Sequence, residues 1–128
     1  MLEIDLADVK AELSEAFDAY ELALTTNDIA GVNELFWESD LTVRYGVREN
    51  ERQYSHAEIA QFRLQRGAVN RPRVLRNRRI TTFGRDMGIA NTEYLIAGSD
   101  RIGRQSQTWV RTQEGWKIVG AHVSVGQP

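Results

Sequence analysis

The second half of this chain alternates strand-like segments with turn sequences, and this pattern constrains the fold most strongly. Three turns, at residues 84–86, 98–100 and 114–115, contain glycine beside polar residues, which favours tight chain reversals. The turns separate four segments rich in β-branched and aromatic residues, at 74–83, 88–97, 101–112 and 116–125. Because short connections join antiparallel neighbours, we predict a four-stranded meander.

The first half has the periodicity of helices. Apolar residues recur at spacings of three and four from residue 6 to residue 24, with acids on the opposite face. Asp28 is a candidate N-cap for a second helix through residues 29–36. A short strand is expected at residues 41–45. Ser55 and Glu58 have the spacing of a capping box, which predicts a third helix ending at Gly67.

Helices followed by an antiparallel meander indicate an α+β fold, in a single domain spanning residues 1–128. We expect three helices packed on a curved sheet, forming a cone with an interior cavity. The chain has no cysteine, which excludes disulfides, thiolate catalysis and cysteine-based zinc sites. No apolar run approaches the roughly 20 residues that span a bilayer, and residues 1–8 carry three acids. We therefore expect a cytoplasmic protein without a membrane partner.

Arginine supplies 14 of the 16 cationic side chains, and some arginines occupy positions that usually carry apolar residues. Arg44 interrupts the short strand, and Arg63 and Arg66 share a helical stripe with Ile59 and Phe62. A buried charge without a partner costs several kcal/mol, so inward-facing arginines indicate a pocket for an anion. Arginine usage combined with ordinary salt bridges is the alternative. The net charge of -2 gives no electrostatic argument for nucleic acid.

Several stretches resemble a known family. Residues 104–111, with 115–119 and 121–124, resemble the closing hairpin of SnoaL-like, NTF2-like proteins. Further stretches narrow the resemblance to the HpxZ/AtzH subfamily over nearly the whole chain: 27–28, 35–37, 42–46, 62–66 and 83–86.

This resemblance implies a cone-shaped NTF2-like fold with three N-terminal helices on a curved, mainly antiparallel sheet. It also implies a homodimer, or a higher homo-oligomer, that associates through the outer sheet face. Members are linked to amidase-signature hydrolases in nitrogen metabolism and cyanuric acid catabolism. Their implied activity is amide hydrolysis of small carboxylated ureas, such as oxalurate or dicarboxyurea.

The residue inventory limits the chemistry that such a hydrolase could use. His56 and His122 lie outside any ligand-spaced motif, so we expect no metal and no cofactor. Neither Lys10 nor Lys117 flanks a serine in a way that suggests a nucleophile and its base. Proton transfer and electrostatic stabilisation by tyrosine and arginine remain.

Tyr20 is the leading catalytic candidate. It lies on the buried stripe of the first helix, where its hydroxyl needs a partner and could give a proton to a leaving nitrogen. The alternative is a core tyrosine bonded to a backbone carbonyl. Arg44 is the second candidate, as a bidentate clamp on a substrate carboxylate, and its alternative is an ion pair with Glu21. Arg63, beside Phe62, is expected to assist as a second clamp.

Two further residues are expected to bind the substrate. Gln107 and Trp109 share one face of the third long strand, where Gln107 could bond the substrate amide and Trp109 could wall the pocket. For Trp109, packing in the core is an equal alternative. By strict alternation, His122 and Ser124 share a face with Trp116, and a structural role at the dimer face is favoured for His122.

The sequence thus predicts a cofactor-independent amidohydrolase for a carboxylated urea or ureide. One rival is a non-catalytic protein that binds the ligand for, or stabilises, a partner amidase-signature hydrolase. Another is an isomerase acting on a hydrophobic substrate, against which the arginine content argues.

Overall fold

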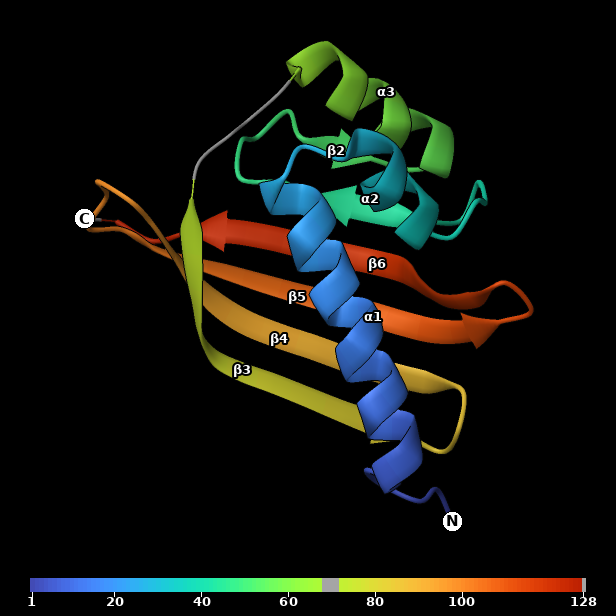
Figure 1. Cartoon of the computed structure of the whole chain (residues 1–128). Coiled ribbons are helices and arrows are strands. Elements are labelled where there is room, and N and C mark those ends of the chain that lie inside the picture. Colours follow the sequence, from blue (N-terminus) through green and yellow to red (C-terminus); the bar gives the residue numbers. More distant parts are fainter. Residues whose placement is uncertain (68–71, 128) are drawn as a thin grey trace.

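The computed structural model describes residues 1–67 and 72–127 of the chain. Helix α1 is long and crosses one face of the sheet, and α2 and α3 lie near the end of α1 that is remote from the N-terminus (Figure 1). The described elements follow in the order α1 (Ala7–Thr25), α2 (Ile29–Leu35), β1 (Val43–Tyr45), β2 (Arg52–Gln53), α3 (His56–Arg66), β3 (Arg73–Phe83), β4 (Met87–Ile96), β5 (Ile102–Thr112) and β6 (Gly115–Val125).

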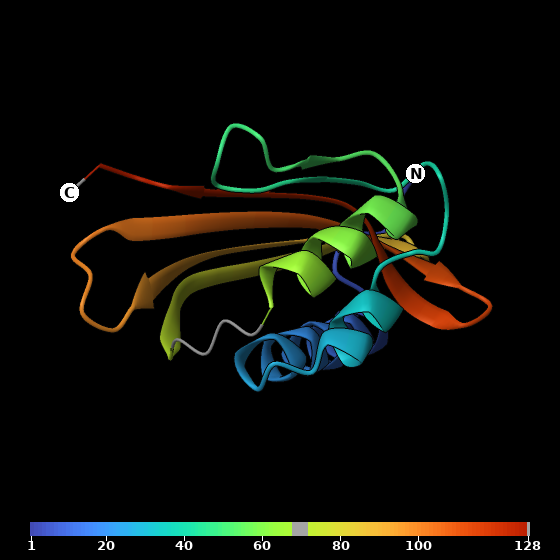
Figure 2. The same cartoon turned by 90° about the horizontal axis from the view of Figure 1, so that it is seen from above.

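The six strands form one sheet in the order β2-β1-β6-β5-β4-β3. Strands β3 to β6 form an antiparallel meander, and β1 joins β6 in parallel. Seen from above, the helices cover a single face of this sheet (Figure 2). The predicted α+β fold and the four long strands are confirmed, and no boundary of these strands differs from the prediction by more than one residue. Strand β2 was not predicted.

The predicted helix starts are confirmed by their caps. Asp28 accepts a 3.0 Å hydrogen bond from the backbone N–H of Gly31, and Ser55 accepts one of 3.1 Å from that of Glu58. The Glu58 carboxylate bonds the backbone N–H of Tyr54, one residue before the position of a standard capping box. These bonds satisfy amides that would lack partners at a helix N-terminus.

The core lies between α1 and the inner face of the meander. Val9, Leu13, Phe17 and Tyr20 form the buried stripe of α1, as the periodicity predicted. Across from them, Trp109, Trp116 and Ile118 are buried on β5 and β6. No helix in the described part of the chain is long and apolar enough to cross a membrane.

A β-bulge on β6 corrects one prediction. Thr108 pairs with Gly120, whereas the next residue of β5, Trp109, pairs with Ile118, so Val119 is an extra residue on β6. An extra residue reverses the alternation of side chains beyond it. His122 is therefore opposite the exposed Ser106 on the outer face, and it does not share the inner face with Ile118.

Candidate anion-binding site

A cavity of about 960 Å³ lies between α3, the β1–β2 hairpin and one end of the inner sheet face. Six arginines and two glutamates are among its described lining residues, an excess of four positive charges in a chain whose net charge is -2. The charged residues of the lining are Arg44, Arg48, Glu51, Arg52, Glu58, Arg63, Arg66 and Arg73. Such a concentration of one sign of charge favours anions.

Arg44 enters the cavity from β1 and is only 6% exposed. Its Nη1 donates a 3.0 Å hydrogen bond to Oε1 of Gln53, and its Cζ lies 5.0 Å from the ring centroid of Phe62. Burial lowers the pKa of Arg44 to about 10, and the neighbouring charge of Arg63 adds to this effect. The guanidinium nevertheless stays protonated at neutral pH.

Arg63 and Arg66 reach the cavity from α3. Arg63 is 3% exposed, its buried Nε has no hydrogen-bond partner among the described residues, and its Cζ lies 5.5 Å from the Phe36 ring centroid. The Cζ atom of Arg66 lies 5.3 Å from the ring centroid of Phe62. The pKa of Arg66 is lowered mainly by burial and to a smaller extent by the neighbouring charge of Arg63. We call Arg44, Arg63 and Arg66 the arginine cluster. Within the described residues, none of the three forms an ion pair with a carboxylate.

Tyr20 lines the same cavity from α1 and is 3% exposed. Its ring packs edge-on against Phe36, with the centroids 6.2 Å apart. The described part of the chain provides no hydrogen-bond partner for its hydroxyl. The two leading candidates, Tyr20 and Arg44, are therefore brought together in one cavity, with Arg63 beside them.

At the sheet side of the cavity, Arg73 is already neutralised. Its Nε donates to Oε2 of Glu21 at 3.2 Å, and its Nη2 donates to Glu21 Oε1 and, at 3.2 Å, to Gln105 Oε1. The guanidinium also lies 4.5 Å from the ring centroid of Tyr94. Glu21, the alternative partner of Arg44, pairs with Arg73 instead. The buried positive charge that no carboxylate of the described residues neutralises therefore lies at Arg44 and Arg63, whereas Arg48 and Arg52 of the lining are exposed.

Gln107 and Trp109 lie outside this cavity. Both are on the inner face of β5, as predicted, but they are 1% and 0% exposed and do not belong to the lining. Trp109 donates its indole N–H to Oε1 of Gln107 at 3.0 Å, which satisfies both groups internally. Gln105, two residues earlier, is the residue of this face that lines the cavity. The pair is therefore placed in the core and not in the candidate site.

The sequence interpretation missed Gln53, Glu51 and Tyr94, all of which line the cavity. Gln53 belongs to a strand of two residues, too short for any periodicity, and Glu51 lies in the turn before it. Tyr94 follows the alternation of β4, which placed it on the inner face without indicating that it borders a cavity.

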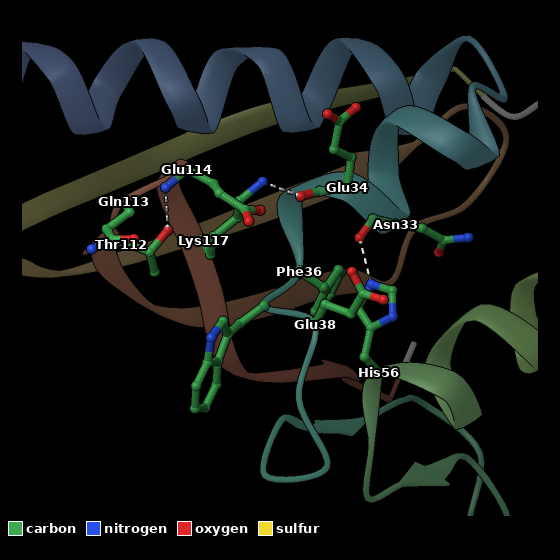
Figure 3. Close-up of a pocket in the computed structure, with 10 residues that line it drawn as sticks. Asn33, Glu34, Phe36, Glu38, His56, Thr112, Gln113, Glu114 and Lys117 are labelled. Atoms are coloured by element: carbon green, nitrogen blue, oxygen red, sulfur yellow. Dashed lines mark hydrogen bonds between the residues drawn. The ribbon is translucent and has the colours of Figure 1, made fainter.

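A smaller cavity of about 460 Å³ lies between α2 and the β5–β6 turn (Figure 3). Its two basic side chains are bound to backbone carbonyls, His56 Nε2 to Asn33 O at 2.8 Å and Lys117 Nζ to Glu34 O at 2.6 Å. Among the described residues, no group of three or more histidine, cysteine or acidic side chains could hold a metal ion.

A curved sheet with its helices on one face and a cavity at the end of the cone defines an NTF2-like protein. A family model described as AtzH-like matches residues 2–128, and the chain belongs to this AtzH-like family. The family prediction is thereby confirmed. No curated protein sequence matches the chain.

Solved structures agree with this assignment. A protein of unknown function from Pectobacterium atrosepticum, of the DUF3225 family, is 51% identical over 97% of this chain and 95% of its own, with a TM-score of 0.92. A cystatin-like fold protein from Burkholderia xenovorans is 40% identical over all of both chains, with a TM-score of 0.91. An NTF2-like superfamily protein from Salmonella enterica is 21% identical over 95% of this chain and 94% of its own, with a TM-score of 0.76, and shares the fold.

Proposed function

We propose that this protein hydrolyses an amide bond of a small carboxylated urea or ureide, such as oxalurate or dicarboxyurea. The observation that carries the proposal is a pair of buried guanidiniums, Arg44 and Arg63, which have no carboxylate partners within the described part of the chain and which line a cavity that Tyr20 also lines. A buried charge of this kind is destabilising unless a ligand neutralises it. A bound carboxylate would supply that neutralisation.

The arginine cluster would bind and orient the substrate. A guanidinium has five N–H donors in a planar fork, and Gln53 accepts from only one nitrogen of Arg44. The remaining donors can bond a carboxylate in two places, which fixes its orientation as well as its position. Because Arg44 and Arg63 are themselves buried, their charged hydrogen bonds to a ligand would be stronger than those of exposed arginines.

Tyr20 would supply the proton for the leaving nitrogen. Amide cleavage needs this proton because an unprotonated amide nitrogen is a poor leaving group, and a positioned acid typically contributes 10²–10⁴-fold to the rate. The Tyr20 hydroxyl has no internal partner among the described residues, so it is free to bond a substrate atom. Arginine charges on the carboxylate side would also stabilise negative charge that develops on the carbonyl oxygen.

The test uses the purified protein alone with oxalurate and with dicarboxyurea, measuring ammonia and carbon dioxide release. We expect turnover by the wild-type protein and its loss in Tyr20→Phe, with a melting temperature within a few degrees of the wild type. Binding of malonate, an unreactive dicarboxylate, is measured in parallel by calorimetry. Malonate binding without turnover of either compound would support the rival function, a binding protein that serves a partner amidase-signature hydrolase.

A further inference from the structure

We infer that Glu51 is a further catalytic residue of this site, the carboxylate that accepts a proton from the attacking water. This inference rests on the proposed hydrolysis. It answers a need that Tyr20 and the arginine cluster leave open, because a proton donor and an anion clamp do not activate water. Hydrolysis of an unactivated amide usually requires a base as well.

The turn between β1 and β2 places Glu51 in the cavity lining. Its carbonyl accepts a 2.8 Å hydrogen bond from the backbone N–H of Gly46, and its own N–H donates to the carbonyl of Arg48 at 2.9 Å. These two bonds close the turn and fix the backbone of Glu51. The position of its side chain is therefore set by the hairpin that also carries Arg44 and Gln53.

Gly46 leaves space for the Glu51 side chain. A Cβ atom at position 46 would overlap Oε2 of Glu51 and would lie 2.8 Å from its Cβ and 2.9 Å from its Cδ. The carboxylate of Glu51 thus lies directly against the glycine backbone at the end of β1. The absence of a side chain at Gly46 is what permits this position.

The other acids near the cavity have structural partners. Glu21 is bonded to Arg73, and Glu58 accepts the backbone N–H of Tyr54. Within the described residues, the carboxylate of Glu51 has neither a hydrogen bond nor an ion pair. It is the lining carboxylate that remains available to bind a water molecule.

The charge of Glu51 interacts electrostatically with the arginine cluster, but its carboxylate forms no salt bridge with the cluster. It opposes the lowering of the pKa of Arg44 and Arg66 that burial causes, so it lies close enough to both to interact. A water molecule between this carboxylate and a substrate bound to the arginines would therefore have its base on one side and the reacting carbonyl on the other.

The step balances without another reactant. The water oxygen bonds to the carbonyl carbon while one water proton passes to Glu51, and the carbonyl π electrons move to its oxygen. When this intermediate collapses, the C–N bond breaks, its electron pair stays on nitrogen, and Tyr20 protonates that nitrogen. The proton on Glu51 then returns through solvent to the Tyr20 phenolate, and both residues regain their starting states.

The experiment compares the wild-type protein with Glu51→Gln, which keeps the shape and removes the base and its charge. We expect kcat on oxalurate or dicarboxyurea to fall by about 100-fold or more. Malonate affinity should rise at the same time, because a negative charge that repels the dianion is removed. A residue that served only the fold would give neither the increase in affinity nor a selective loss of kcat.

Two further variants complete the test. Glu49→Gln removes the same charge two residues away in the same turn, at an exposed position outside the lining, and should leave kcat unchanged. Gly46→Ala should displace the Glu51 carboxylate and reduce kcat while Glu51 itself is intact. If Glu51→Gln turns over at the wild-type rate, the role of Glu51 is overturned and the proposed hydrolysis stands. If the wild-type protein cleaves neither compound, both proposals fall.

Discussion

Arg44 and Gln53 are direct cross-strand partners of β1 and β2, and their buried side chains share a 3.0 Å hydrogen bond. Strand β2 contains only two residues, so its contribution to the sheet is small. Its contribution to the cavity is larger, because Gln53 holds one nitrogen of a guanidinium that has no carboxylate partner among the described residues. Pairing of these strands thus positions the charge that we assign to substrate binding.

Replacing Gln53 with leucine should weaken both stability and anion binding. The variant leaves a buried Arg44 N–H without its acceptor, at a cost of about 1–3 kcal/mol in the free energy of unfolding. Malonate affinity should fall because the guanidinium loses its fixed orientation. Urea denaturation and calorimetry measure the two effects. Unchanged malonate affinity would show that Gln53 does not position Arg44 for a ligand.

Replacing Arg63 with methionine should stabilise the protein while weakening anion binding. Methionine has a similar length, and it removes a buried charge whose Nε lacks a partner among the described residues. Exchanges of buried charges for apolar residues can stabilise a protein by about 1–4 kcal/mol. Urea denaturation of the unliganded variant measures this gain. Arg79→Met, at an exposed position, serves as the control and should change neither property. A destabilised Arg63→Met would contradict the view that this charge is retained for a ligand.

Replacing Phe62 with leucine should reduce malonate affinity. The Phe62 ring contacts two members of the cluster, with the Cζ atoms of Arg44 and Arg66 at 5.0 Å and 5.3 Å from its centroid. Each such cation–π contact is worth about 0.5–2 kcal/mol. We expect affinity to fall by roughly tenfold, with a smaller effect when Arg66 is already methionine. A full additive effect in that double variant would exclude coupling between Phe62 and Arg66.

The low pKa of Arg44 makes malonate binding sensitive to alkaline pH. In the folded, unliganded protein the pKa of this guanidinium is about 10, well below its ordinary value, mainly because the group is buried. As pH rises through about 10, the guanidinium loses its proton and malonate affinity should fall. Calorimetry from pH 8 to pH 11 measures this decrease, and Arg44→Met should bind weakly throughout.

The same shift predicts the direction of the effect on stability. From about pH 10 up to the ordinary pKa of an arginine, the unfolded chain binds a proton at Arg44 that the folded protein has released. The contribution of Arg44 to the free energy of unfolding therefore rises with pH over this window, and below it the cost of burying the charge is constant. The free energy of unfolding of the wild type minus that of Arg44→Met should therefore increase with pH above about pH 10. If this difference in the free energy of unfolding does not depend on pH, then burial does not lower the pKa of Arg44.

The long elements could be predicted because their signals are local. The stripe of α1 and the turns of the meander are visible within a few residues of sequence, and the side chains of Asp28 and Ser55 accept bonds from backbone N–H groups only three residues further along the chain. Tyr20, Arg44 and Arg63 were found for a related reason. Each is a polar residue at a position whose periodicity requires burial.

Other parts depend on distant segments and could not be predicted. Side-chain parity placed Gln107 and Trp109 on the inner face, but the point along β5 at which core gives way to cavity depends on how the helices pack across the sheet. Glu51 lies in a turn, where no periodicity indicates whether a side chain faces solvent or a cavity. The bulge at Val119 has only a weak signal in the sequence, the adjacent Gly120, because glycine inside a strand often marks a bulge without fixing which residue is extra.

This bulge decides which side chains of β6 border the cavity. If β6 kept Val119 but paired without the bulge, strict alternation would turn the imidazole of His122 toward the helices and Val123, now part of the lining, toward solvent. Deletion of Val119 would instead leave both residues on their present faces, because the pairing beyond the bulge would not change. A single unpaired residue thus determines whether an imidazole or an isopropyl group is offered to a ligand.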